Sequence, residues 1–275
     1  MKGGGHPLAI ELISAHGLNP VDMVHLCADL GVPRIGLAQS PVITIPEGRP
    51  SWNLGEDPAL HRAVQSALRE RGVRVVLGEG FLIHPQMAMA NSAANLDRLA
   101  ELGTERVNCV GLEPDEARMH DEFALFASLA AERGLAATIE YMPFVAVDSL
   151  DKAIACVSAS GLDSAGILLD SMHVFRTGTD LAAIAALPLE RIGHVQLCDS
   201  RAGLDAQAYM ACAKSERLAP GTGELPLHAF LDAIPDGLTV GLEVPQMSLA
   251  LSGMDDRERL NALIEACRSF STDLL

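Results

Sequence analysis

Short apolar runs alternate with helix-like segments along the whole chain, and this alternation limits the possible folds more than any other feature. The apolar runs predict eight strands, at residues 8–14, 34–39, 73–81, 106–112, 136–142, 165–170, 192–199 and 238–245. Segments with helical period fall at residues 19–31, 57–72, 89–103, 114–134, 149–161, 179–187, 226–234 and 255–270. Several end on a glycine suited to a helix C-cap, such as Gly72 and Gly161. This pattern predicts a parallel sheet closed into a single (β/α)8 TIM barrel over residues 1–275.

A doubly wound open sheet is the alternative arrangement of alternating strands and helices. It would be expected to carry a glycine-rich GxGxxG turn after the first strand. The sequence LISAHGLNP at residues 12–20 does not supply that turn. No composition break or Pro- and Ser-rich linker divides the chain, and a length of 275 residues is ordinary for one barrel domain. The barrel is therefore the favoured fold.

Charge and composition exclude several functions. The formal net charge is −16, and a surface this acidic would repel the phosphates of nucleic acid. No segment has the roughly 18 consecutive apolar residues of a membrane span, and the N-terminal stretch lacks the apolar centre of a signal peptide. We therefore expect a cytoplasmic protein that acts on a small molecule, with homo-oligomerisation left open. The six cysteines form no CxxC motif, which predicts reduced thiols.

The last four predicted strands end on side chains that can bind a metal. These are Glu140 on the fifth strand, Asp170 and His173 at the sixth, His194 and Gln196 on the seventh, and Glu243 on the eighth. Each carboxylate alone could simply cap a helix or pair with an arginine. In a barrel, however, the C-terminal strand ends meet at one rim, where three carboxylates would repel one another unless a cation neutralised them. The sequence therefore predicts a divalent metal site at this rim.

The seventh strand decides which metal the site would hold. His194 and Gln196 share one face of that strand, and Gln196 lies nearer the C-terminal end. We therefore expect Gln196 to be the ligand and His194 to lie one layer deeper, as a supporting or packing residue. With three carboxylates, an amide oxygen completes an all-oxygen set that suits Mn²⁺ or Mg²⁺. Coordination by His194 or His173 would instead make Co²⁺ or Zn²⁺ plausible.

The segments IEYMP, LLDSMH, HVQLCDS, PGTGELPL and GLEVP resemble the xylose isomerase-like TIM-barrel superfamily. That superfamily includes sugar isomerases, ketose 3-epimerases, inosose dehydratases, 3-dehydroshikimate dehydratases and endonuclease IV. The resemblance covers essentially the whole chain, with its motifs concentrated from residue 140 onward. It implies one divalent metal bound by Glu140, Asp170, Gln196 and Glu243. Ketose epimerases usually have histidine where this chain has Gln196, whereas some dehydroshikimate dehydratases have glutamine, so the departure weakens an epimerase assignment.

The same resemblance implies roles for two further residues. His173, in a sequence like the family's DxxH, would face the substrate, and Arg217 would reach a substrate oxygen or carboxylate. A solvated arginine is the competing interpretation of Arg217. Endonuclease IV requires a larger, histidine-rich set of three metals and a basic surface, and neither is visible in this sequence.

A metal bound to a ketone and its neighbouring hydroxyl would promote loss of a proton from the adjacent carbon, giving an enediolate. Glu140 or Glu243 could take that proton, and His173 could return it or protonate a departing hydroxyl. The leading hypothesis is therefore a metal-dependent isomerase or epimerase of a small keto-sugar or related carbohydrate. A lyase that dehydrates a 3-dehydroshikimate-, inosose- or 3-keto-glycoside-type substrate is the runner-up. A barrel that binds a ligand without catalysis is the third hypothesis.

The earlier strands offer weaker candidates. Glu79 ends the third predicted strand and His84 follows it, so both could bind substrate hydroxyls, although a salt bridge is an equal alternative. Trp52 lies in a long Pro- and Gly-rich loop over residues 40–58, where it could cover the substrate or pack against the barrel or a partner subunit. Glu11 is expected at the barrel floor, with no assigned role.

Overall fold

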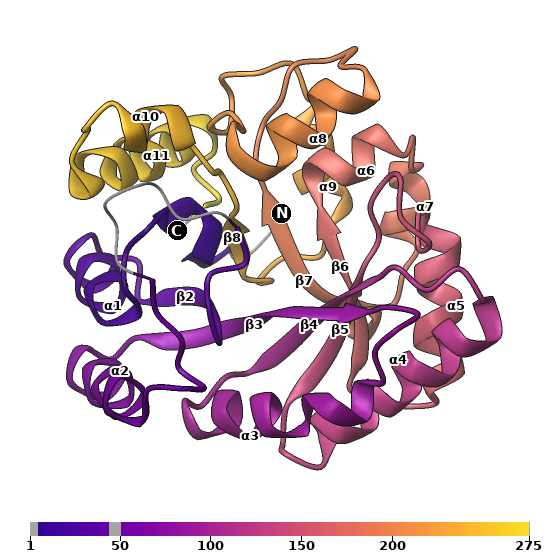
Figure 1. Ribbon diagram of the computed structural model, residues 1–275. Helices are drawn as coiled ribbons and strands as arrows, with labels where there is room; N and C mark the ends of the chain where they lie inside the picture. The colour runs from indigo at the N-terminus through magenta and orange to yellow at the C-terminus, as the bar shows by residue number, and fades with distance from the viewer. Residues whose placement is uncertain (1–4, 44–50, 275) are drawn as a thin grey trace.

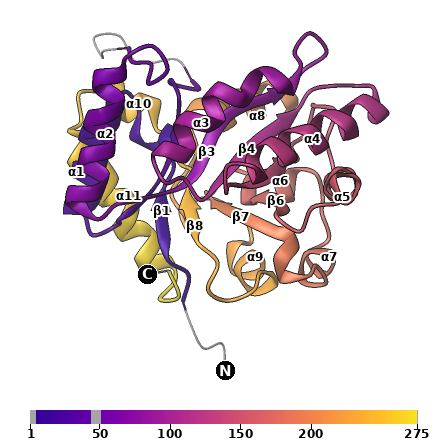
Figure 2. The ribbon, with the colours of Figure 1, turned by 90° about the horizontal axis from the view of Figure 1, so that it is seen from below.

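The computed structural model describes residues 5–43 and 51–274. Within them, eight parallel strands pair in chain order, and the first pairs with the last to close a barrel. The strands are β1 (Leu8–Ile10), β2 (Arg34–Ala38), β3 (Arg74–Ile83), β4 (Arg106–Gly111), β5 (Ala136–Glu140), β6 (Ala165–Asp170), β7 (Ile192–Leu197) and β8 (Val240–Leu242). Figures 1 and 2 show the helices arranged around these strands. The predicted (β/α)8 barrel is confirmed.

Helices of different length cover the outside of the barrel. They are α1 (Pro20–Asp29), α2 (Pro58–Arg71), α3 (Ala93–Glu101), α4 (Glu116–Ala131), α5 (Leu150–Ser160), α6 (Ser171–Arg176), α7 (Leu181–Ala185), α8 (Ala206–Ser215), α9 (Leu227–Ala233), α10 (Met247–Leu251) and α11 (Asp256–Phe270). Local sequence explains several boundaries. Asn19 and Asp57 cap the first turns of α1 and α2, and each helix begins with a proline. Gly72 and Gly161 end α2 and α5 in the left-handed conformation that glycine tolerates best.

Some strand boundaries differ from those predicted. The predicted strand at 8–14 ends at Ile10, because Leu12–Ala15 form a short 3-10 helix. The predicted strand at 238–245 is confined to Val240–Leu242, whereas β3 runs on to Ile83. Apolar periodicity alone did not distinguish a buried 3-10 turn from a buried strand. The six cysteines are free thiols, and no helix among the described residues is long and apolar enough to cross a membrane.

Glu11, just after β1, lies entirely buried inside the barrel. Its carboxylate occupies the space that a Cβ atom would fill at Gly36 on β2 and at Gly241 on β8. Glycine on both neighbouring strands therefore makes room for an acidic side chain in the barrel interior. The Oε1 atom of Glu11 lies 2.6 Å from Nε2 of His194.

Candidate active site

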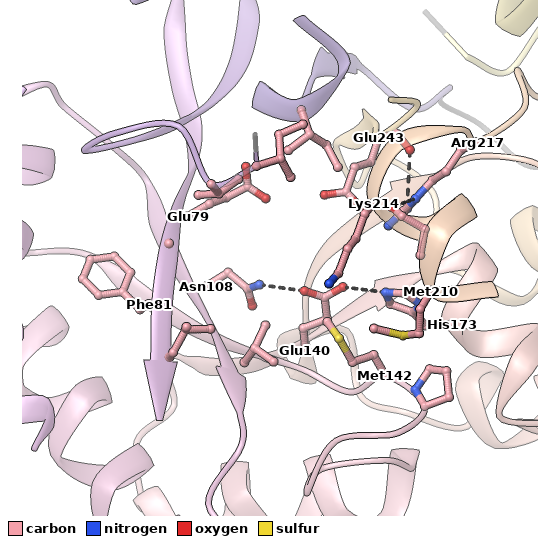
Figure 3. A pocket seen from close by; sticks show the side chains of 18 of the residues that line it. Glu79, Phe81, Asn108, Glu140, Met142, His173, Met210, Lys214, Arg217 and Glu243 are labelled. Carbon is pink, nitrogen blue, oxygen red and sulfur yellow. Dashed lines mark hydrogen bonds and ion pairs between the residues drawn. The ribbon is translucent and has the colours of Figure 1, made fainter. Parts of the chain in front are cut away.

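A cavity of about 300 Å³ lies where β5 and β8 end, and Figure 3 shows the side chains around it. Polar groups gather on its inner wall and apolar side chains line much of the remainder. The polar and charged lining residues are Glu79, Asn108, Glu140, His173, Tyr209, Lys214, Arg217 and Glu243. The cavity thus brings together side chains from β3, β4, β5, α6, α8 and the segment after β8.

Arg217 connects two of the predicted metal ligands. Its Nη1 atom donates a hydrogen bond to Oδ2 of Asp170 at 2.5 Å and lies 2.7 Å from Oε2 of Glu243. All three residues are at least nine-tenths buried. Burial opposes ionisation of Asp170, but the positive charges of Arg217 and His173 outweigh it and hold the pKa of this carboxyl below its usual value. Asp170 also accepts hydrogen bonds from the backbone of residues 172 and 173, which fixes it at the start of α6.

Glu140 and His173 form a second cluster on the same cavity. Oε1 of Glu140 lies 3.4 Å from Nε2 of His173, and Oε2 accepts a hydrogen bond from Nδ2 of Asn108 at 3.1 Å. Nδ1 of His173 hydrogen-bonds the hydroxyl of Tyr209, which orients the ring. Burial, with the nearby charge of Asp170, raises the pKa of Glu140 to about 8. Burial lowers the pKa of His173 to about 4.

Gln196 and Glu79 hold oxygen atoms that have no partner. Nε2 of Gln196 donates to Oε1 of Glu79 at 3.4 Å, whereas Oε1 of Gln196 and Oε2 of Glu79 are buried without a hydrogen bond from any described residue. Burial raises the pKa of Glu79 to about 8, with a further contribution from the charge of Glu11. Burial also raises the pKa of Glu243 well above its usual value, despite the attraction of Arg217.

The donor set fits a hard divalent cation. Four carboxyl groups (Glu79, Glu140, Asp170 and Glu243) lie at or directly behind the cavity, against the two basic lining residues Lys214 and Arg217. Glu140, Asp170 and His173 offer ligand atoms that lie within 4.8 Å of one another. The orphaned Oε1 of Gln196 is an acceptor of the kind that a cation would satisfy. The excess of carboxyl groups over basic side chains and the unpartnered oxygen of Gln196 therefore both support a cation at this rim.

Two predicted substrate-binding residues lie away from the cavity lining. His84 follows the end of β3, and its Nδ1 accepts a hydrogen bond from the backbone of Gln86. Trp52 is 7% exposed, and its indole donates to the carbonyl of Leu18 at 3.2 Å, beside a separate, smaller cavity. Trp52 therefore has the position of a packing residue and not of a residue that covers the large cavity. Residues 44–50 of the same loop lie outside the described part of the chain.

Three polar residues of this site were not predicted from the sequence. Tyr209 and Lys214 lie on α8, for which no helix was predicted, and Asn108 lies inside β4. A signal for α8 was present: Asp205 caps the helix, and Tyr209 and Ala213 share its buried face four residues apart. Asn108 had a weaker signal, a polar residue within an otherwise apolar strand.

The fold and the site define a class: a closed parallel barrel whose C-terminal rim gathers acidic side chains and a histidine around one cavity. The sequence profile of the xylose isomerase-like TIM barrels matches residues 24–270, and the chain belongs to this family.

Two curated proteins and one solved structure illustrate the relationship. A Streptomyces coelicolor protein named "Putative hydroxypyruvate isomerase" is 30% identical in an alignment of 217 residues that covers 66% of this chain and 72% of that protein. A 3-dehydroshikimate dehydratase of Pseudomonas putida is 26% identical over 63% of this chain, but the match spans only 29% of that protein. The crystal structure of an IOLI protein with a bound zinc atom, 15% identical, covers 97% of this chain and 99% of its own, with a TM-score of 0.74. At that identity, the last likeness concerns the fold alone.

Proposed function

We propose that this protein is a divalent-metal-dependent isomerase that moves a proton between the carbons of a small hydroxy-ketone, such as a keto-sugar or a related carbohydrate. The observation that supports the proposal best is the convergence of Glu140, Asp170, Glu243 and His173 on one buried site at the barrel rim. The relative named "Putative hydroxypyruvate isomerase", which this chain matches over 72% of that protein's length, supports the same reaction class.

Each of the converging residues has a role in the proposal. Glu140, Asp170, Gln196 and Glu243 would hold the ion, with Mn²⁺ or Mg²⁺ favoured by their oxygen donors. When bound, the ion would polarise the ketone oxygen and stabilise the negative charge that develops on the substrate. Glu140 or Glu243 would remove the proton next to the ketone.

His173 and Arg217 complete the proposed machinery. His173, held by Tyr209 through Nδ1, presents Nε2 toward Glu140 and would return the proton to the substrate. Arg217 lines the cavity and would meet a substrate oxygen. The apolar wall, including Met142 and Met210, would exclude water from the reacting atoms.

A dehydratase is the second candidate. Two observations favour it: the glutamine at position 196, and relatives named 3-dehydroshikimate dehydratase in two Pseudomonas species. In that reaction His173 would protonate a departing hydroxyl instead of a carbon. Both candidates are small-molecule enzymes, and a cytoplasmic location without a nucleic-acid partner, with homo-oligomerisation left open, remains part of the proposal.

Two measurements test the proposal. Protein purified without chelator is analysed for bound metal, and the Mn²⁺-loaded protein is then incubated with a panel of hydroxy-ketones in D2O. Nuclear magnetic resonance follows exchange of the hydrogen beside the ketone, and ultraviolet absorbance follows new conjugated double bonds. Exchange with a rearranged product supports the isomerase, whereas conjugated product supports the dehydratase. Protein without metal and without exchange would instead be a ligand-binding barrel, and the Glu140→Gln variant serves as the inactive control.

A further inference from the structure

The cavity has two chemically different ends. Acidic and amide side chains gather at the inner end, where Glu79, Glu140 and Glu243 face the cavity. The rest of its lining is mostly apolar and includes Ile43, Phe81, Leu82, Met142 and Met210. A ligand that fills the cavity therefore meets acidic and amide groups at one end and carbon surface along much of its remaining length.

Two lining side chains are permanent cations, and they differ in what they already bind. Arg217 is committed to Asp170, to Glu243 and to the carbonyl of Ala213, which accepts from its Nε at 2.9 Å. The Lys214 amine makes no hydrogen bond or ion pair with any residue in the described ranges 5–43 and 51–274. Lys214 is therefore the lining cation that has no acidic partner of its own among the described residues.

The backbone of α8 aims Lys214 into the cavity. Met210, Ala213 and Lys214 all line it, and their spacing of three and four residues places them on one face of the helix. Figure 3 shows the Lys214 side chain extending into the pocket, with its amine directed toward Glu140. Lys214 is one of only three lysines in the chain. It is exposed to solvent, which leaves the amine accessible to an incoming molecule.

We propose that Lys214 binds the carboxylate of the substrate, so that the site takes a short hydroxy-keto acid in preference to a neutral, polyhydroxylated sugar. The proposal rests on the proposed function for the position of the hydroxy-ketone, which would lie at the inner, acidic end. The carboxylate would then lie toward α8, where the ammonium group of Lys214 pairs with it.

Charge and hydrogen bonding both favour an acid of this kind. Lys214 places a positive charge on the cavity lining that attracts a ligand carboxylate and offsets its repulsion by the acidic side chains. A polyhydroxylated chain would place several hydroxyl groups against Met142 and Met210, which offer them no hydrogen-bond partner of comparable strength. A hydroxyl group that gives up its hydrogen bonds to water and gains none from the protein weakens binding. A short keto acid has fewer such hydroxyl groups and avoids this cost.

A matched pair of ligands tests the proposal: hydroxypyruvate and 1,3-dihydroxyacetone share a hydroxy-ketone and differ by the replacement of a carboxylate with a hydroxymethyl group. Their affinities for the Mn²⁺-loaded protein are measured by calorimetry in the parent protein and in Lys214→Met and Lys214→Arg. A second pair, 3-dehydroshikimate and its methyl ester, repeats the comparison for a ring acid. Lys152→Met is the control, because Lys152 lies on α5 in an exposed ion pair with Asp148.

We expect the parent protein to bind at least one acid tenfold or more tightly than its neutral counterpart. Lys214→Met should lose tenfold or more in affinity for that acid and less than twofold for the neutral ligand, while Lys214→Arg retains most of the selectivity. Equal affinity for acid and neutral ligand, an equal loss of both in Lys214→Met, or no binding of any of the four ligands overturns the proposal. Failure of the proposed function itself is seen separately, as absence of bound metal and of hydrogen exchange.

Discussion

Among the described residues, one histidine–glutamate pair lies in the barrel interior and another at the rim, and the two differ in what surrounds them. Nε2 of His194 lies 2.6 Å from Oε1 of Glu11 in the barrel interior, where both side chains are at most 1% exposed. Nε2 of His173 lies 3.4 Å from Oε1 of Glu140, and both of these residues line the large cavity. Neither His194 nor Glu11 lines that cavity. The same two residue types therefore make a closed internal contact in one place and an open, substrate-accessible one in the other.

Perturbed acidity does not distinguish the two pairs. Burial raises the pKa of both Glu11 and Glu140 to about 8, and it lowers the pKa of His194 to about 3 and that of His173 to about 4. A shifted pKa is often taken to mark a functional site, but structural groups shift in the same way when they are buried. Access to a cavity is the property that separates the candidate catalytic pair from the structural one.

The largest expected effect is on catalysis. Glu140→Gln should lower the rate of hydrogen exchange by about 10²–10⁴-fold, because it removes a proton-transfer group and a metal ligand together. Glu11→Gln should lower the same rate by less than about tenfold, since Glu11 does not reach the cavity. The two rates are compared in Mn²⁺-loaded variants of equal thermal stability. Similar losses in both variants would remove the distinction between the pairs.

The next effect is on stability. His194→Ala should reduce the free energy of unfolding by about 1–3 kcal/mol, because it leaves the Glu11 carboxyl buried without its partner. His173→Ala should cost less, since the cavity admits water to Glu140. Urea denaturation of both variants at one pH gives the comparison. A larger loss in His173→Ala would mean that the rim pair, and not the interior pair, supports the fold.

A smaller effect is expected on metal affinity. Arg217→Met should tighten Mn²⁺ binding by about tenfold, equivalent to about 1.4 kcal/mol, because it removes a cation that already neutralises Asp170 and Glu243. Arg176→Met is the matched control, since Arg176 lies over the ring of Tyr209 at the same rim. Calorimetric titration of the metal-free proteins provides the affinities. Unchanged or weaker binding in Arg217→Met would show that the guanidinium and the ion do not compete.

The smallest effect is a difference in pH dependence. The folded-state pKa of Glu11, raised by burial to about 8, lies above its ordinary value of 4.5, so the folded protein retains a proton that the unfolded chain releases. This contribution to stability is present below pH 4.5 and is lost as the pH rises through 8. Glu11→Gln cannot titrate, so the parent protein should lose stability relative to this variant as the pH rises from about 5 to 8. Parallel stability curves over that range, measured by urea denaturation, would contradict the raised pKa.

The sequence predicted the barrel and the rim because both follow from local patterns. Once the strands were assigned, the positions of Glu140, Asp170 and Glu243 followed from barrel closure. The ion pairs of Arg217 were not predictable in the same way, since they depend on how the chain after α8 returns to the rim. That segment is held in part by backbone hydrogen bonds from residues 221, 223 and 225 to Asp199.

The placement of other residues depended on contacts between distant segments. The sequence did not decide whether Trp52 covers the substrate or packs as a structural residue. The hydrogen bond from its indole to Leu18 joins two loops that lie 34 residues apart in the sequence. His84 directly follows β3, as predicted, but it does not line the cavity to which Glu79 belongs. Its Nδ1 instead accepts a hydrogen bond from the backbone of Gln86, a turn contact that the strand pattern did not predict.

Glu11 and its two flanking glycines have a consequence for related sequences. The space for this carboxylate exists only while Gly36 and Gly241 both lack a Cβ atom, so the three positions are constrained as a set. Evolutionary replacement of either glycine by alanine should coincide with a shorter or absent acid at position 11. A survey of homologous chains would then show three distant columns varying together, and that covariation would report on steric volume inside the barrel and not on the chemistry of the reaction.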